Sequence, residues 1–591
     1  MRRLAITAAL LFALPRAFAA APIDYVPADT AYVLTSLNAM PPAAAERFQR
    51  YIEPVSAAFK SGFNAGLLKE LALASGTDAK AAARAEAEQG WQLLSDLGQL
   101  WVNDEAALKA GFKPKALFAI YGVGAVPVLR MEISDSAKVS ATIVQSLDKI
   151  IALSKRANAK KPTKDRLPEF SFTRAALRGG EIFRLGTEKI QPIVVVEGKH
   201  LVLSLMPLGA KADLVDMVAP ASAISAKAVS NKLAALRSRY GFDGFGLGFI
   251  EFAALSKVYM GSPNRLETAL WAANEKGKLP APTAACKTEM LAAINNMPRV
   301  VVGYTEISGT KFTQKMVLEL APPIAQKFAN SVSPMPAFGA GNAFKMGFSI
   351  DPLKLMDAMR VQADKITTNP YTCPEMLSLN ESASKLKESL ANPMLGMVSM
   401  VKGFGVSADS MEMDLAAEKP EPRNITANAA IFTDQPEAVL GMLQGYVPQL
   451  ANTKPTLDGK PVALDAAAFA GIPKGGLSVN EGYAAMTKSM LIVGVGKNRA
   501  AELSALQRAP ASKTGESFTL HYGPAIMQLG VASMEQSMEK ANTSKSAEEK
   551  LEWSKFTQAY RDMVNQLESF GFSMGFGKDG LEMISTMTYK K

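Results

Sequence analysis

Histidine and cysteine are scarce in this sequence, with only two of each among 591 residues. Most zinc, haem and iron–sulfur centres need several such ligands, so these centres are poor candidates for the basis of its function. The shortage of histidine also removes most catalysis that depends on an imidazole base. We therefore expect no metal and no cofactor, and a binding role is favoured over an enzymatic one.

A long apolar run is also missing after the N-terminal region. A transmembrane helix needs ~20 consecutive, mostly apolar residues, and no later uncharged stretch reaches that length. We therefore expect no transmembrane segment in the mature chain. Hydrophobic residues make up 48% of the sequence and charged residues 20%, which is typical of a folded globular protein. The formal net charge of +10 is mild for this length and does not indicate a nucleic-acid partner.

The N-terminus has the three parts of a secretory signal peptide. Two arginines follow Met1, an apolar run covers residues 4–14, and an A-x-A pattern stands at 17–19. The sequence predicts a signal peptide over residues 1–19 and a periplasmic mature protein. The alternative is a buried N-terminal helix.

Cys286 and Cys373 are the two cysteines. An exported chain meets an oxidising compartment, which favours a disulfide between them. That bond would close a loop of about 86 residues and stabilise the fold by roughly 4 kcal/mol in the chain-entropy model. The alternative is two separate buried thiols. Neither cysteine has a histidine near it in the sequence, so a catalytic thiolate is not expected.

A strand, a turn and then a helix recur four times along the chain. We expect the strands at 31–37, 245–252, 344–350 and 518–524. After the third strand, Asp351-Pro352 is typical of a helix N-cap followed by proline in the first helical position.

Each of these segments is followed by another helix and then by a β-hairpin. Glycine, aspartate and serine stand at the expected turns, as tight hairpins require. Met411 and Met413 alternate with Glu412 and Asp414, which predicts one buried and one solvated sheet face. The expected hairpins join 116–123 to 126–133, 300–307 to 311–320, 401–407 to 411–417, and 570–576 to 581–589.

Two of the copies carry an inserted group of short strands, within 179–205 and 476–495. The simplest explanation is a duplication into two halves, 20–333 and 342–591, joined near Pro334–Gly341. The expected fold class is α+β, with duplicated units of antiparallel sheet and β-hairpins covered by helices. The alternative is an α+β chain in which such strings recur by chance.

Two serine-hydrolase motifs occur without the context that their chemistry needs. Ser573 completes a G-x-S-x-G pattern, but this pattern lies in an alternating strand and no histidine follows it. Ser382 and Ser384 fit S-x-x-K, yet both lie in a polar stretch in the middle of an expected helix. We therefore assign no catalytic residue and no cofactor-binding residue.

Methionine is abundant, with 29 residues. Its flexible side chain fills irregular cores and lines adaptable apolar grooves. Met394, Met397 and Met400 are spaced three apart, which on a helix forms an apolar stripe. Core packing is the favoured interpretation of this stripe, and an apolar-ligand groove or a copper site are the alternatives.

A P-A-D-T segment at 27–30 follows the predicted signal peptide. Together with 111–114, 118–122, 127–130 and 369–374, this segment resembles a family of exported bacterial proteins of unknown function. The resemblance covers only part of the chain. It implies a periplasmic location and no assigned activity.

These observations together predict a non-enzymatic binding or scaffold protein of the bacterial cell envelope. We expect its partner to be an envelope protein or an apolar ligand held between sheet and helices. The alternatives are a periplasmic carrier of a lipid or other apolar ligand and, less favoured, a serine hydrolase acting on cell-wall or ester substrates. A scaffold predicts an exposed apolar patch, whereas a carrier predicts a large apolar pocket.

Overall fold

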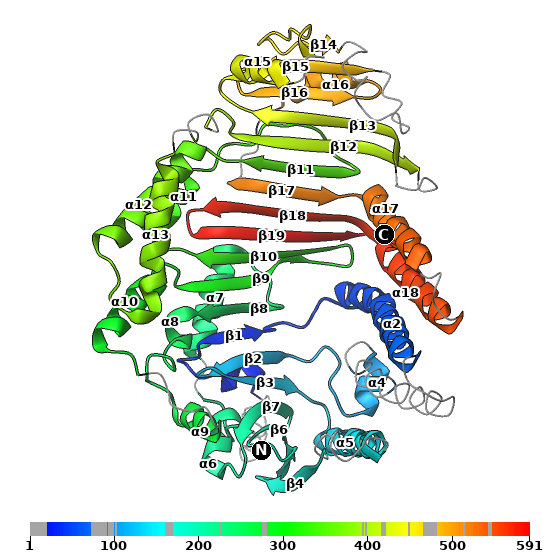
Figure 1. The fold of residues 1–591 in the computed structure, drawn as a ribbon. Coiled ribbons are helices and arrows are strands. Elements are labelled where there is room, and N and C mark those ends of the chain that lie inside the picture. The colour runs from blue at the N-terminus through cyan, green and yellow to red at the C-terminus, as the bar shows by residue number, and fades with distance from the viewer. Residues whose placement is uncertain are drawn as a thin grey trace, which may run out of the picture. The chain divides into compact units, whose positions relative to one another are not determined.

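Figure 1 shows the fold of the chain in a computed structural model. The predicted signal peptide (1–19), Met394, Met397 and the expected strand at 476–479 lie outside the residues that it describes. The structure describes residues 20–72, 92, 100, 103–159, 170–224, 227–274, 281–392, 395, 399–414, 421–446, 450–464, 481–509, 511, 515–541 and 547–591.

Two compact units make up the chain. Their boundaries do not coincide with the two expected halves, 20–333 and 342–591, so the halves stay a prediction. Unit 1 comprises Met1–Ala39, Gln92–Ile250 and Ala254–Ala281, and unit 2 comprises Met40–Trp91, Glu251–Ala253 and Pro282–Lys591.

Unit 1 is built on an antiparallel sheet whose hydrogen-bonded neighbours follow the order β4-β5-β6-β7-β3-β2-β1-β8. The strands are β1 (Tyr32–Thr35), β2 (Phe118–Val123), β3 (Val126–Glu132), β4 (Phe172–Leu177), β5 (Gly180–Leu185), β6 (Ile190–Glu197), β7 (His200–Pro207) and β8 (Leu247–Glu251). The helices of unit 1 are η1 (Pro22–Tyr25), α4 (Asp104–Lys109), α5 (Ser136–Ala159), α6 (Ala212–Val218), α7 (Lys227–Tyr240) and α9 (Arg265–Ala273). Helix α8 (Phe252–Leu255) contains the boundary between the two units.

Both faces of the unit 1 sheet are covered. On one face, Val139 and Leu147 of α5 pack in a core with Val194 of β6. On the other face, the buried Tyr121 hydroxyl donates a hydrogen bond to the carbonyl of Val218 at the end of α6, at 3.3 Å. This two-sided burial explains why β6 contains the continuous apolar stretch Ile193–Val196 instead of an alternating pattern.

Unit 2 contains the antiparallel order β9-β10-β19-β18-β17-β11-β12-β13-β16-β15-β14. The strands are β9 (Arg299–Ile307), β10 (Lys311–Glu319), β11 (Phe344–Ser349), β12 (Gly403–Asp414), β13 (Glu421–Phe432), β14 (Val462–Ala463), β15 (Gly482–Thr487), β16 (Met490–Val495), β17 (Glu516–Tyr522), β18 (Leu567–Gly577) and β19 (Gly580–Tyr589).

Several helices of unit 2 directly follow a strand, as the sequence predicts. The Asp351 carboxylate accepts a hydrogen bond from the Lys354 amide at 3.1 Å, so Asp351-Pro352 begins α12 as expected. The helices are α2 (Pro42–Ala72), α10 (Ala284–Ile294), α11 (Pro322–Ala329), α12 (Pro352–Thr368), η3 (Pro374–Met376), α13 (Leu377–Leu390), α15 (Pro436–Tyr446), α16 (Arg499–Leu506), α17 (Pro524–Ala541) and α18 (Ala547–Asn565).

One pairing order occurs in both units. In unit 1, β1 lies between β8 and β2, and β3, β7, β6 and β5 follow β2. In unit 2, β11 lies between β17 and β12, and β13, β16, β15 and β14 follow β12. A duplicated α+β unit would produce this repetition, and the duplication itself stays a prediction.

One of the four expected hairpins is wrong. The segments 401–407 and 411–414 do not face each other, because Gly403–Asp414 is a single strand that pairs with β13. The rest of the expected second strand, 415–417, lies outside the described residues. The expected turn, Ala408-Asp409-Ser410, is instead a bulge at which the register shifts. The other three hairpins are confirmed as β2–β3, β9–β10 and β18–β19.

The fold class is confirmed as α+β, with antiparallel strands, hairpins and flanking helices. Among the described helices, none combines the length and the apolar character needed to cross a lipid bilayer.

Candidate functional site

One face of the central strands of unit 2 is apolar over seven neighbouring strands. Residues that are opposite in register lie on the same face of a sheet. Phe572 is opposite Leu520 on one side and Ser585 on the other, and this face continues from β9 to β12. We call it the Phe–Met face. The polar Gln314 and Ser585 also lie on it. Its aromatic, methionine and leucine residues are Tyr304, Phe312, Met316, Leu318, Phe344, Met346, Phe348, Phe404, Phe518, Leu520, Tyr522, Phe570, Phe572, Met574, Phe576, Leu581, Met583 and Met587.

Most side chains of the Phe–Met face are only half-buried. Phe572, Met574 and Met583, in the middle of the face, remain partly accessible, and Phe404 is 43% exposed. Ring pairs link neighbouring strands along it, for example Phe518 with Phe572 at 6.2 Å between centroids. Such pairs stabilise the sheet without removing the outer side of the rings from water.

Helices of unit 2 cover the two ends of these strands. Phe328 of α11 stacks on Phe576 near one end, with ring centroids 5.0 Å apart. At the other end, Ala44 of α2 and Met527 of α17 pack in a cluster with Phe312. Figure 1 shows α10–α13 beyond one end of β11, β17, β18, β19 and β10, and α2, α17 and α18 beyond the other. The middle of the Phe–Met face therefore lies between two helical borders.

The opposite face of the same strands carries small and polar residues. Ser573 is opposite Thr519, and His521 is opposite Lys345. Burial and the nearby Lys345 ammonium lower the pKa of His521, and burial lowers the pKa of Lys345. The sheet is therefore amphipathic, as predicted, but its apolar side is not fully buried.

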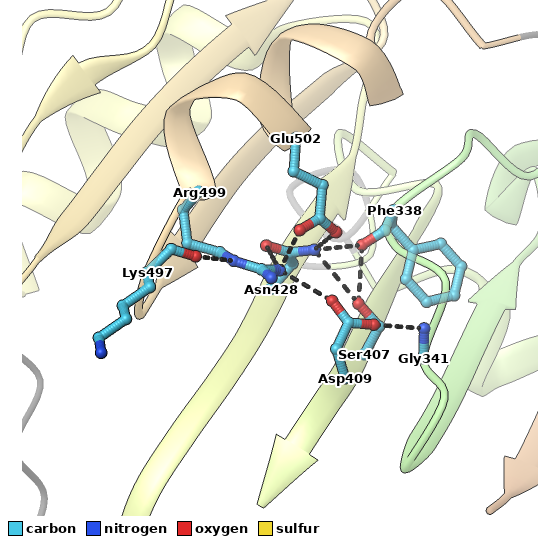
Figure 2. Close-up of polar contacts among 8 residues, drawn as sticks. All are labelled: Phe338, Gly341, Ser407, Asp409, Asn428, Lys497, Arg499 and Glu502. Carbon is cyan, nitrogen blue, oxygen red and sulfur yellow. Dashed lines mark hydrogen bonds and ion pairs between the residues drawn. The ribbon is translucent and has the colours of Figure 1, made fainter.

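A buried polar cluster, which we call the clamp, lies on this opposite face near α16 (Figure 2). The Ser407 hydroxyl and the Asn428 amide both donate to the Phe338 carbonyl, at 2.9 and 3.2 Å. The Asp409 carboxylate accepts from the Gly341 amide at 2.9 Å. The clamp thus fastens the segment before β11 to strands β12 and β13.

Arg499 is the cation of the clamp and is 6% exposed. Its guanidinium lies 3.0 Å from the Asp409 carboxylate and also pairs with Glu502, one turn along α16. Glu502 in turn accepts from the Asn428 amide at 3.1 Å. Sequence reasoning missed this cluster. The one available signal was an asparagine inside the apolar strand β13.

The sequence-predicted serines have no catalytic arrangement among the described residues. Ser573 lies in the interior of β18, not at a strand-to-helix elbow. Ser382 and Ser384 are exposed on α13, where their hydroxyls donate to the carbonyls of Ser378 and Asn380. These local hydrogen bonds are typical of serine within a helix.

The structure brings the sulfur atoms of Cys286 and Cys373 to disulfide distance, with their Cα atoms 4.7 Å apart. Both residues are buried, at the start of α10 and just before η3. The Glu289 carboxylate accepts from the Thr372 hydroxyl and from the amides of Cys373 and Thr372 beside the pair, and these hydrogen bonds, the hydroxyl's first, lower its pKa. Glu375 lies near both sulfurs, but sulfurs engaged with each other offer no thiolate to a metal.

In unit 1, the segment before β1 covers a second buried cation. The Tyr25 ring lies over the Arg130 guanidinium, 3.7 Å from it, and contacts the ring of His200 edge-on at 5.0 Å. Arg130 and His200 are 3% and 5% exposed. Burial, with the nearby Arg130 charge, lowers the pKa of His200 to about 4.

Unit 1 is expected to lose stability as the pH falls from about 6.5 to about 4. In this range the unfolded chain protonates His200, whose pKa is near 6.5 when exposed, while the folded protein keeps it neutral. The loss is about 3 kcal/mol and levels off below the folded pKa. Thermal unfolding at pH 7 and pH 4.5 measures it. His200→Gln should reduce the difference between the two pH values, whereas His521→Gln, in unit 2, should leave most of it. An unchanged difference in His200→Gln would contradict this expectation.

Comparison of the chain with protein-family models, with curated protein sequences and with solved structures gives no match.

Proposed function

We propose that this protein is a non-enzymatic binding or scaffold protein of the bacterial cell envelope, acting in the periplasm, and that it docks a partner protein on the Phe–Met face. The observation that carries the proposal is the half-exposed apolar face in the middle of the unit 2 sheet. Large apolar patches that stay accessible to solvent mark interaction sites. Methionine adds flexible side chains that adapt to a partner's surface.

The geometry favours a partner surface over an enclosed carrier cavity. The Phe–Met face extends over seven strands, its middle side chains stay partly exposed, and helices border it at the strand ends. A polypeptide can lie across such a surface, whereas a lipid carrier normally encloses the acyl chain. The Cys286–Cys373 pair is compatible with an oxidising compartment and so supports the proposed location.

A glutamate on the Phe–Met face is expected to weaken the binding of an apolar ligand to this face about tenfold. Met574→Glu places a charge where a bound partner or dye must exclude water, which costs roughly 1–2 kcal/mol of binding free energy. Ser573→Glu is the matched control, because the adjacent residue of the same strand points to the opposite face. Titration of each purified variant with an apolar fluorescent dye, bis-ANS, measures the accessible apolar face. Equal dye binding by both variants would contradict the assignment of the face.

Site-specific cross-linking tests the nature of the occupant. Met574→p-benzoylphenylalanine is compared with Ser573→p-benzoylphenylalanine after illumination of producing cells. Protein-sized adducts at position 574 but not at 573 would support the scaffold. Lipid-sized adducts at 574 would favour the carrier instead, and no adduct at 574 would overturn both.

A further inference from the structure

A cavity of about 280 Å³ lies in unit 2 on the face opposite the Phe–Met face. Its floor includes Ser349 at the end of β11, Phe432 at the end of β13 and Met490 at the start of β16. The segment Ser333–Ala337 and the end of α16 form its other walls. Ser349, Gly403, Phe432 and Met490 are successive partners in register, which places them in one row on that face.

Two residues that line this cavity each carry a buried side-chain atom without a hydrogen-bond partner. The Ser349 hydroxyl belongs to a residue that is 0% exposed, and the Gln507 amide nitrogen is likewise buried. Buried polar groups are almost always satisfied, so two orphaned groups beside one cavity require an explanation. The amide nitrogen can only donate, and a hydroxyl can donate as well. Both groups are therefore suited to an oxygen acceptor on a bound molecule.

The cavity is formed in advance by the clamp. Phe338, directly after the wall segment, is held through its carbonyl by Ser407 and Asn428. Pro334 and Pro336 restrict the backbone of the same segment. Because the clamp already holds this wall in the free protein, ligand binding costs little conformational entropy.

A charged pair borders the cavity, and part of its floor is apolar. Lys402 and Asp434 line it as an ion pair whose lysine is 29% exposed. Phe432 and Met490, each 2% exposed, supply the apolar surface. The volume is near the lower end of ligand pockets, roughly 300 Å³, and excludes a molecule of lipid size.

We propose that this cavity binds a small organic carboxylate with a short apolar group. The carboxylate accepts from Ser349 and Gln507 and lies close to the Lys402 ammonium, while the apolar group contacts Phe432 and Met490. This site is independent of the partner-binding role of the Phe–Met face, because the two lie on opposite sides of the sheet.

Calorimetric titration of the full mature chain with benzoate, and with benzyl alcohol as a neutral probe of similar shape, tests the proposal. We expect benzoate to bind at least tenfold more tightly than benzyl alcohol. Ser349→Ala should weaken benzoate about tenfold, and Gln507→Leu should act in the same direction. The control is Ser504→Ala, whose hydroxyl bonds to the Ala500 carbonyl on α16 and does not line the cavity.

Thermal unfolding of the ligand-free variants separates binding from a structural role. If the ligand is the hydrogen-bond partner of the Ser349 hydroxyl, this hydroxyl is unsatisfied in the free protein. Ser349→Ala should therefore keep or raise the melting temperature. Weaker benzoate binding with an unchanged or higher melting temperature supports the site. No benzoate binding by the wild type would overturn the proposal. A lower melting temperature with unchanged benzoate affinity would also overturn it.

Discussion

Replacing Cys286 and Cys373 together with serine is expected to lower the free energy of unfolding by about 4 kcal/mol. The two residues are 87 positions apart, and a cross-link over that span restricts the unfolded chain strongly. The bond joins α10 to the segment between α12 and α13, so the helical border at one end of the Phe–Met strands depends on it. Calorimetry of the oxidised wild type and the double variant measures the loss.

Reductant provides the control for this result. Reducing the wild type should lower its stability to about that of the double variant, whereas the double variant should not respond. The hydrogen bonds from Thr372 and Cys373 to Glu289 remain in both, so the two segments stay neighbours in the folded state. A wild type that is insensitive to reductant, with two titratable thiols before treatment, would contradict the bond.

Arg499→Met is expected to destabilise unit 2 by about 4 kcal/mol. The substitution keeps much of the side-chain volume but leaves the carboxylates of Asp409 and Glu502 without their buried cation. Removing one member of a buried ion pair typically costs 3–5 kcal/mol, because the remaining charge stays partly desolvated. Denaturant unfolding of the wild type and of Arg499→Met measures this loss as a shift of the unfolding midpoint of unit 2.

Two further variants separate charge from packing at the clamp. Arg508→Met removes an exposed arginine just beyond α16 and should change stability by less than about 0.5 kcal/mol. Adding Asp409→Asn and Glu502→Gln to Arg499→Met removes the unpaired charges and should restore part of the loss. If Arg499→Met lowers the free energy of unfolding no more than Arg508→Met does, the clamp does not hold the segment before β11 as described.

Local patterns account for much of what could be predicted. The period-two alternation in 570–576 and 581–589 depends only on neighbouring residues, and it identified β18 and β19 and their turn. The helix start at Asp351-Pro352 was equally local, since a cap involves residues three apart. The Cys286–Cys373 pair could be proposed because the chain offers no other cysteine.

The sequence-based predictions were wrong where a residue's role depends on a contact that is distant in the sequence. Asp409 is typical of a turn, but its carboxylate is bound by Arg499, 90 residues away, and the strand continues past it as a bulge. No sequence pattern predicted a site at Ser349 or Gln507, because serine at a strand end and glutamine at a helix end are both common. They become a candidate site only because the tertiary structure brings both of them, with the segment 333–337, to the lining of one cavity.

The sequence by itself determined the α+β class, most strand positions and the start of α12. These properties follow from side-chain periodicity and capping, which operate within a few residues. Only the tertiary structure decided that the Phe–Met face stays half-exposed and that Arg499 meets two carboxylates. Both depend on where distant helices and segments pack, and alternation within a strand carries no information about what covers it.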